Sequence, residues 1–486
     1  MTEMKKTLWA WVEDQAAFLG KLGDAVYSYA ELGMQEVYTS RLLQEVFRAH
    51  GFTVEEGISG IPTAFLATYG SGQPTVALLE EFDALPNTSQ KPGIPFHDPI
   101  VGGAPGHGEG HNTNAAVLVG AALALKAVLE KHNLPGTIKA FGVPAEEQLV
   151  SRPFFVRDGY LKGVDFAIDG HIHSRFGTSY GIKSYGLISA EFTFRGKTAH
   201  AGVSPWLGVS ALDAVQLMNI GYEFLREHLP PTLRVHHVTS YGGDQPNVVP
   251  ARASTWYFFR EQSAEATRIL YQRAKQVAAG AAMMTGTSVE DRILSAVWPV
   301  RANKLLAEIA FQNIREIGMP RWSREEQRLA KAVQRAVGLD PLGLPTGIEP
   351  LQRATQFGGS SDVGDVSWVV PYVRIDFPAQ PIGIPFHHWS AGVCAATSIA
   401  HKGIAAGVKA IAATALEVMT QPRLLTRVKQ SFRRELGKTR YTPLLPPEVS
   451  PPVHLNREIM EKYRPAMQRY YYDPSSSESY LEMFQR

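Results

Sequence analysis

The stretch AAVLVGAALALKAVLEKHNLPGTIKAFGV, residues 115–143, decides the fold class because it joins two apolar segments of different kinds. The first predicts a helix over 116–132, which charged residues interrupt and which is too short to span a bilayer, so we expect it to be buried. The second, GTIKAFGV at 136–143, is apolar on both faces, as is TVALLEEF at 75–82. Short runs of this kind are typical of central strands covered by helices on both sides. The order strand, helix, strand therefore predicts an α/β fold with a parallel or mixed sheet.

The pattern changes near residue 184. GLISAEFTFRG alternates apolar and polar residues as a half-exposed antiparallel strand does, and further strand and helix patterns follow it. VPYVRIDF, at 370–377, is apolar again and indicates a strand that returns to the first sheet. We therefore expect an α+β unit inserted into a larger α/β domain. The expected parts are, in chain order, 1–184, 185–299, 300–424 and a C-terminal extension at 425–486.

Composition and charge exclude several classes of protein. The chain has 48 Lys and Arg against 46 Asp and Glu, and no basic stripe with interleaved aromatic residues, so a nucleic-acid partner is not expected. The content of 44% hydrophobic and 19% charged residues is that of a globular protein that is not embedded in a membrane. The single cysteine, Cys394, excludes an internal disulfide, and no export signal is visible at the N-terminus. We therefore expect a cytoplasmic protein.

Side chains that can bind a metal follow several of the predicted strands. The segments are HGEGH (107–111), PAEE (144–147), GHIH (170–173) and PFHHW (385–389). Alone, each is more often a surface or packing feature than a ligand. Hydrolytic metal sites, however, take their ligands from loops at the carboxyl ends of strands, and here all of these segments are so placed. Their coincidence predicts a metal site, in which either His171 or His173, and either His387 or His388, is the ligand.

Motifs along most of the chain resemble one known family. GHGEGHN, GTIKAFGVPAEEQ, FRGKTAHAG, PNVV, SSDVGDVSW and TSIAHKG are similar, in order and spacing, to the peptidase family that contains aminoacylases, carboxypeptidase G and auxin-conjugate amidohydrolases. The resemblance covers residues 10 to 420. It implies a zinc-exopeptidase-like α/β catalytic domain interrupted by an α+β lid and dimerisation domain. It also implies one or two divalent transition metal ions (Mn, Zn, Co or Fe) and a homodimer or higher homo-oligomer.

The resemblance also assigns roles to residues of the catalytic domain. The metal ligands of the family fall on Glu109, His111, Glu147, His171 and His387. Glu146 matches the general acid/base, which must reach the attacking water and is held in place by its neighbour, a ligand. A divalent metal polarises the scissile group and lowers the pKa of water. Asp83, in EEFDALP, is expected to orient a ligand histidine.

In the lid, the resemblance implies residues that contact substrate. His200 matches a histidine that stabilises the oxyanion, often in the active site of the partner subunit. Asn247 and Arg260 match positions that hold a substrate carboxylate, for which the planar guanidinium is suited. In the alternative interpretation Asn247 fixes a turn and Arg260 pairs with an acidic neighbour. His236 and His237 face opposite sides of a lid strand, and we expect both to be structural.

The chain departs from this branch of the family at the metal site and in the lid. Glu109 stands where cysteine is usual, and the harder carboxylate favours manganese, iron or cobalt over zinc and leaves one or two metals open. Trp206 and Val209 stand where a histidine and an arginine occur in the p-aminobenzoyl-glutamate-cleaving branch. The loss of a cation argues against a second substrate carboxylate, and tryptophan offers a face to an aromatic ring. These changes favour a small aromatic acid over a dipeptide-like amide. Together with the family resemblance, we expect a small aromatic or N-acyl carboxylate as substrate.

Three functions fit these residues. The first is metal-dependent hydrolysis of a C–N bond in an aryl or N-acyl amino acid-like carboxylate, as in a p-aminobenzoyl-glutamate-type amidohydrolase. The second is removal of an aryl amino group from an anthranilate such as 5-nitroanthranilate, since the same machinery would serve. The third is a catalytically inactive binding protein on this scaffold. Retention of Glu146 beside Glu147 argues against the third, because a binding protein needs no base next to a ligand.

Overall fold

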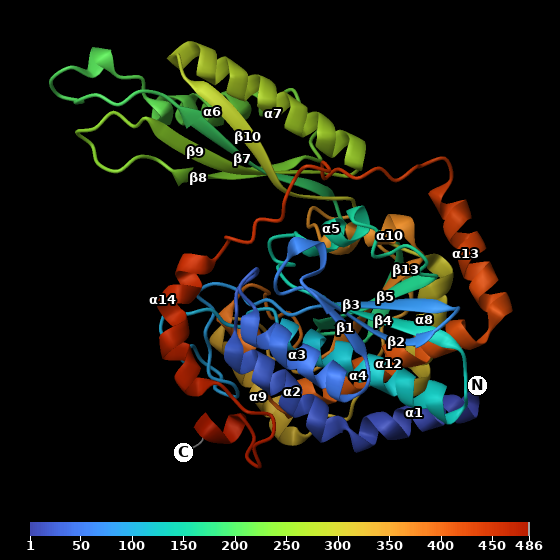
Figure 1. Ribbon diagram of the computed structural model, residues 1–486. Coiled ribbons are helices and arrows are strands. Elements are labelled where there is room, and N and C mark those ends of the chain that lie inside the picture. Colours follow the sequence, from blue (N-terminus) through green and yellow to red (C-terminus); the bar gives the residue numbers. More distant parts are fainter. Residues whose placement is uncertain (485–486) are drawn as a thin grey trace.

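The computed structural model describes residues 1–484, and Figure 1 shows a lid lying over a larger α/β domain. Within these residues, the larger domain holds a nine-stranded mixed sheet in the order β1-β2-β4-β3-β5-β13-β6-β11, with β12 paired to β6. Its strands are β1 (Thr53–Glu56), β2 (Phe65–Ser71), β3 (Thr75–Glu81), β4 (Gly136–Val143), β5 (Phe166–His173), β6 (Gly177–Ile182), β11 (Arg301–Ala302), β12 (Gln352–Arg353) and β13 (Tyr372–Pro378). The strands predicted at 75–82, 136–143 and 370–377 are therefore present.

The centre of the sheet is parallel, and this arrangement sets the position of the site. β3 pairs in parallel with β4 and with β5, and β5 pairs in parallel with β13. All residues of β3 are buried, as its apolar sequence predicts. Because the carboxyl ends of parallel strands meet at one edge, the loops that follow these strands converge there. The metal-binding segments predicted from the sequence lie in those loops or at the strand ends.

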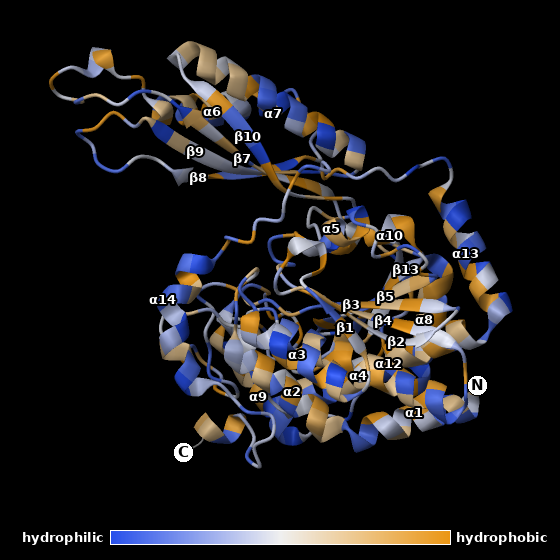
Figure 2. Ribbon diagram, in the orientation of Figure 1, coloured by the Kyte–Doolittle hydropathy of each residue, from blue (hydrophilic) through white to orange (hydrophobic). Residues whose placement is uncertain are grey.

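Helices cover both faces of this sheet. The helices of the larger domain before the C-terminal extension are α1 (Thr2–Asp14), α2 (Ala16–Tyr29), α3 (Val37–Ala49), α4 (His111–Lys131), α5 (Ser151–Arg157), α8 (Lys304–Ile317), α9 (Arg324–Ala336), α10 (Val366–Val369), α11 (Trp389–Gly392) and α12 (Ser398–Thr420). Of these, α3, α4, α8, α10 and α12 contact the strands of this sheet directly. Figure 2 shows apolar residues concentrated on the central strands and on α4 and α12. By length and composition α4 and α12 could cross a membrane, but 89% and 78% of their apolar windows are buried inside the protein. Both are therefore core helices, as expected for the segment at 116–132.

Helix α4 begins five residues earlier than the sequence pattern predicts, at His111. Gly110, at φ +99°, takes the left-handed conformation that ends the preceding loop. The polar first turn is buried because its side chains have partners: Asn112 Nδ2 donates to the carbonyls of Gly23 (3.1 Å) and Ala395 (2.8 Å). The prediction from hydrophobic periodicity was wrong here because polar residues begin the helix. His111 is thus held rigidly on the first turn.

The lid is a four-stranded antiparallel sheet in the order β10-β7-β9-β8 with two helices on one face. Its elements are β7 (Gly186–Arg195), α6 (Ala211–Arg226), β8 (Arg234–Tyr241), β9 (Arg252–Glu261), α7 (Ala264–Thr285) and β10 (Ser288–Val297). In Figure 1 the helices lie on the side of the lid sheet away from the larger domain. This confirms an α/β domain with an inserted α+β lid. The domain boundaries at 184 and 299 stay predictions.

The C-terminal extension wraps around its own chain. It contains α13 (Pro422–Leu436) and α14 (Arg457–Met467), which lie on opposite sides of the molecule and are joined by a segment that passes beneath the lid (Figure 1). On this path Thr442 accepts a hydrogen bond from Trp298 Nε1 (2.9 Å), and Tyr441 donates to Asp365 (2.6 Å). The extension therefore fastens the base of the lid to the larger domain.

Candidate active site

Side chains from the ends of four parallel strands and from α4 meet in one place. Glu81 is the last residue of β3, and Glu146 and Glu147 follow β4. His171 lies at the end of β5, and His387 follows β13. Glu109 and His111 come from the loop and first turn of α4. The structure thus brings together all the residues that the sequence resemblance assigned as ligands, and adds Glu81.

Glu109 lies between two of the ligand histidines. Its Oε1 is 3.2 Å from His171 Nε2, and its Oε2 is 3.0 Å from His387 Nε2. His387 Nε2 is also 3.1 Å from Glu147 Oε2. Each carboxylate oxygen of Glu109 therefore faces a different histidine, which is the arrangement of a carboxylate that can bridge two positions.

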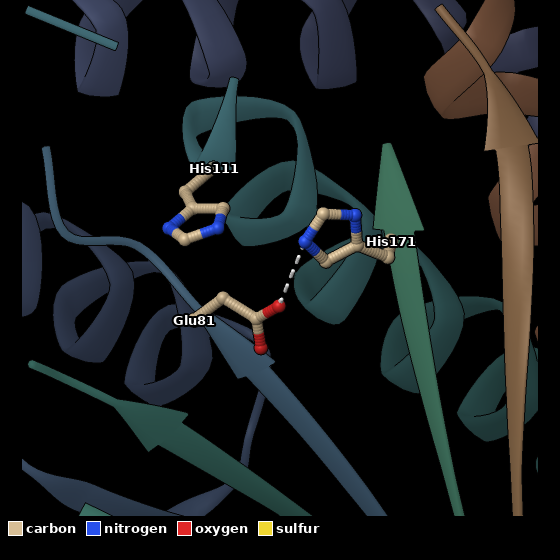
Figure 3. Close-up of side chains that lie close together, drawn as sticks. All are labelled: Glu81, His111 and His171. Carbon is tan, nitrogen blue, oxygen red and sulfur yellow. Dashed lines mark ion pairs between the residues drawn. The ribbon is translucent and has the colours of Figure 1, made fainter. Parts of the chain in front are cut away.

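The donor atoms fit a divalent metal. Two groups have one ligand atom per residue within 4.8 Å of one another: Glu81, His111 and His171 (Figure 3), and Glu109, His111 and Glu147. His111 Nε2 and Glu147 Oε1 are buried and have no hydrogen-bond partner among the described residues. Unsatisfied buried polar atoms are rare and call for an explanation such as an ion. Imidazole and carboxylate ligands suit manganese, iron, cobalt or zinc.

Asp83 orients two of the ligand residues, as expected for a ligand histidine. His111 Nδ1 is 3.1 Å from the Asp83 carbonyl and 3.4 Å from its Oδ1, which leaves Nε2 to face the site. The backbone N–H of Glu147 donates to Asp83 Oδ2 at 3.0 Å. Because Asp83 contacts both ligands, it fixes their relative positions.

Glu81 was not predicted as a site residue. Its Oε1 is 3.7 Å from His171 Nε2, and its Oε2 pairs with the buried Arg152. Burial raises the pKa of Glu81, but Arg152, Arg374 and the histidines outweigh burial and lower it to about 2. The only signal in the sequence was a pair of acidic residues at the end of an apolar strand, where carboxylates are otherwise expensive to bury.

The pKa values of the metal-binding side chains are strongly shifted. Burial alone would raise the pKa of Glu109, yet its contacts with His171 and His387 hold it well below its usual range. Hydrogen bonds to Glu109 and Glu147 raise the pKa of His387 to about 10. Burial raises the pKa of Glu147 to about 7. Protons held by these groups therefore compete with a metal ion for the same ligand atoms.

Glu146 lies beside this group with one oxygen fixed. The hydroxyl of Ser361 donates to Glu146 Oε1 at 2.7 Å. Burial, with added repulsion from Glu81 and Asp362, raises the pKa of Glu146 well above its usual value. The preceding residue, Ala145, has a φ of +54°, and its N–H donates to Glu36 at 2.8 Å. Strained backbone of this kind persists only where the surroundings enforce it, and is common at active sites.

The geometry favours one histidine in each ambiguous pair. His173 contacts no carboxylate of the group: its Nδ1 accepts from the N–H of Ser174 (2.8 Å), and burial lowers its pKa to about 4. His388 caps α11, with Nδ1 2.8 Å from Ser390 Oγ. His171 and His387, in contrast, both contact Glu109.

A cavity of about 640 Å³ opens beside these residues. Glu109, Glu146, Glu147, His171 and His387 line one part of it, and Arg260 of the lid lines another. Its aromatic walls are Phe357 and Phe386. Arg260 of the lid therefore lines the same cavity as the metal-binding residues of its own chain.

The other lid residues singled out in the sequence do not line this cavity. Trp206 is 77% exposed, and His200 and Asn247 are also exposed. His200 and Asn247 lie on neighbouring backbone segments. The N–H of Ala201 donates to the Asn247 carbonyl (3.0 Å), and His200 and Val248 form an isolated antiparallel β-bridge. Asn247 therefore takes part in a turn through its backbone, which leaves the role of its exposed side chain a prediction.

Comparisons with known proteins agree with this site and fold. Residues 182–282 match the family description "Peptidase dimerisation domain". The chain is 33% identical over 457 residues to one of the subunits of p-aminobenzoyl-glutamate hydrolase from Escherichia coli K12, which covers 88% of this chain and 95% of the relative.

Solved structures share the fold. An aminobenzoyl-glutamate utilization protein from Klebsiella pneumoniae has a TM-score of 0.58 at 19% identity, covering 85% of this chain and 98% of that one. A dinuclear metal binding peptidase of Bacillus subtilis from the M20 family has a TM-score of 0.50 at 18% identity, covering 83% and 98%. Taken with the identity to the Escherichia coli relative, these findings show that the chain belongs to the M20 family of metal-dependent peptidases and amidohydrolases, enzymes that hydrolyse C–N bonds.

Proposed function

We propose that the protein hydrolyses the C–N bond of an aryl or N-acyl amino acid-like carboxylate, in the manner of a p-aminobenzoyl-glutamate amidohydrolase. One observation carries this proposal: a single cavity joins the carboxyl group of Glu146, the metal-binding group and the guanidinium of Arg260, which has no acidic partner among the described residues. Proton transfer, metal ligation and recognition of a substrate anion are thereby available to one bound molecule. The 33% identity to the Escherichia coli p-aminobenzoyl-glutamate hydrolase supports the same substrate type.

A divalent metal held by Glu109, His111, Glu147, His171 and His387 would polarise the scissile carbonyl and make water more acidic. Glu146 takes the proton of the attacking water and passes it to the leaving nitrogen. Burial raises the pKa of Glu146 above that of an exposed carboxyl, which makes its carboxylate a stronger base toward the water proton. The hydroxyl of Ser361 fixes one oxygen of Glu146, so the other is free for the proton.

Arg260 binds the substrate carboxylate in this proposal. No acidic residue in the described chain pairs with it, which argues against the alternative that it serves a structural ion pair. Phe357 and Phe386 supply apolar walls for an aromatic group, in addition to the exposed Trp206. His200, Asn247 and Trp206 would act in the cavity of the partner in a homodimer formed through the lid. We further propose manganese, iron or cobalt as the metal, because Glu109 is a hard ligand, and a cytoplasmic location without nucleic-acid or membrane partners.

The test separates cleavage of an amide from deamination. Purified protein loaded with Mn²⁺ is incubated with p-aminobenzoyl-glutamate and, separately, with 5-nitroanthranilate. Release of glutamate from the first supports the proposal, and ammonia from the second alone would replace it with aryl deamination. A Glu146→Gln variant serves as control for contaminating hydrolases. No product from either compound would refute the assigned substrate type.

A further inference from the structure

Lys183 is a cation of the cavity wall that the proposed mechanism does not use. It lies in the linker between β6 and β7, where the chain passes from the larger domain into the lid. Its backbone is held on both sides: its N–H donates to Val300 (2.9 Å), and its carbonyl accepts from Phe357 (3.0 Å). Its side chain lines the cavity and forms no ion pair within residues 1–484. The backbone is therefore fixed while the ammonium group is available.

Positive charge prevails in the cavity lining outside the metal-binding residues and Glu146. The lining cations there are Arg175, Lys183, Arg260, Arg353 and Arg374. The lining carboxylates outside the metal-binding residues and Glu146 are Glu349 and Asp376. Five cations thus accompany two carboxylates, so positive charge exceeds negative charge in this part of the lining.

Several of these cations already have partners. Arg175 Nε donates to Asp376 Oδ2 at 2.8 Å, and Arg374 pairs with Asp169 at 2.8 Å. Burial lowers the pKa of Lys183 even though Asp376 faces it, and the nearby Arg374 adds to this effect. Lys183 therefore faces Asp376, which Arg175 already binds, and shares this carboxylate with other cations. A buried cation is costly, so it usually serves a ligand or a neighbour.

Arg260 is oriented by two neighbours but likewise forms no ion pair within residues 1–484. Its Nη1 lies 3.2 Å from His236 Nε2, and its guanidinium lies 5.3 Å over the ring of Phe258. Its Nε is buried without a hydrogen-bond partner among the described residues. His236, which we expected to be purely structural, therefore also helps to orient this side chain. The arginine keeps donors for a ligand beyond these contacts.

One glutamine fastens the segments that carry Lys183 and Arg260 to each other. Gln356 Nε2 donates to the carbonyl of Ser184, next to Lys183, at 2.9 Å. The same nitrogen donates to the carbonyl of Gln262, two residues after Arg260, at 2.8 Å. Because both cations also line the same cavity, they can contact a single bound group.

We propose that Lys183 and Arg260 form a carboxylate-binding subsite that selects substrates by an anionic group remote from the scissile bond. The proposal rests on the proposed function. An arginine offers a planar pair of donors and a lysine a point charge, and together they suit one carboxylate. Lys183, in the linker, thus adds a second cation to Arg260, and the site thereby accepts the acidic amino acid part of an amide.

Binding to a silenced enzyme tests the subsite apart from turnover. Glu146→Gln protein loaded with Mn²⁺ is titrated calorimetrically with p-aminobenzoyl-glutamate and with its diamide, in which both carboxylates are neutral amides. We expect the diacid to bind roughly 10- to 100-fold more tightly, as for a charged hydrogen-bonded pair. Adding Lys183→Met should reduce that preference about tenfold without changing the affinity for the diamide. Lys183→Arg in its place should retain most of the preference.

Lys275→Met is the matched control, since Lys275 lies on α7 of the lid and pairs with Asp291 outside the cavity. It should leave both affinities unchanged. The subsite is overturned if the silenced enzyme shows no preference for the diacid, or if Lys183→Met weakens both compounds equally or neither. If the diacid is preferred and this preference depends on Lys183, but the wild type does not turn over p-aminobenzoyl-glutamate, the subsite is retained and the proposed amidase function is rejected. If the wild type turns over the substrate but the silenced enzyme shows no such preference, only the subsite is rejected.

Discussion

Replacing Glu109 by glutamine should weaken metal binding while leaving the fold intact. The carboxylate faces His171 Nε2 at 3.2 Å and His387 Nε2 at 3.0 Å. Glutamine has nearly the same shape but carries no charge, and one of its two terminal atoms is a donor that cannot bind a metal. The substitution therefore removes one ligand atom and the negative charge between the histidines.

The size of the effect follows from these contacts. A charged hydrogen bond contributes about 1.5–3 kcal/mol and a neutral one about 0.5–1.5 kcal/mol, so the loss is of the order of 1–2 kcal/mol for each contact. At about 1.4 kcal/mol per tenfold, the affinity for Mn²⁺ should fall roughly 10- to 100-fold or more. Glu109→Cys should instead shift the preference from Mn²⁺ toward Zn²⁺, because a thiolate is a softer ligand.

Both effects can be measured by titrating metal-free protein with Mn²⁺ and Zn²⁺ against a competing chelator. Glu349→Gln is the matched control, since Glu349 lines the same cavity outside the metal-binding group. Its affinity for either ion should equal that of the wild type. An unchanged Mn²⁺ affinity in Glu109→Gln, with the fold preserved by circular dichroism, would refute the assignment of Glu109 as a ligand.

Three further predictions follow from the same geometry. Glu146→Gln should lower turnover by about two orders of magnitude or more while Mn²⁺ affinity stays the same, and preserved turnover would mean that the base lies elsewhere. Asp83→Asn should weaken Mn²⁺ binding roughly 10- to 100-fold, because Asp83 holds His111 and Glu147 from behind; an equal affinity in the chelator assay would contradict this role. The pKa values of His387, about 10, and of Glu147, about 7, are both raised, so each must lose a proton when metal binds. Affinity should therefore rise with pH up to about 10, and most steeply below about 7, where both groups are protonated. Calorimetry in buffers of different ionisation enthalpy measures this proton release, and a pH-independent affinity without release would contradict it.

Much of the fold could be predicted from the sequence because its central strands are apolar on both faces and are bounded by turns. β1, β2, β6, β11 and β12 were not predicted; β11 and β12 have only two residues each, and β1 has only four. Residues of β6 and β12 line the cavity, and the linker residue Lys183, which follows β6, was not predicted as a site residue either. Its role depends on which charges lie around it, and that information is spatial.

The candidate site, like the fold, could be predicted in part from the sequence. Glu109, His111, Glu147, His171 and His387 stand in short motifs after strands, and the structure brings them together. Glu81 was missed because its position is that of an ordinary strand end. The choice of His171 over His173 needed the contact with Glu109, since the two side chains lie on the same face of β5 and differ only in depth.

The function inferred for this site depends on Glu109 being a metal ligand placed between two histidines, and anomalous diffraction from a crystal grown with Mn²⁺ can locate the ion. We expect an anomalous peak within bonding distance of a Glu109 oxygen and of His171 or His387, with two peaks on either side of Glu109 if the site is dinuclear. A peak held by other residues, with Glu109 contacting only protein, would contradict this assignment.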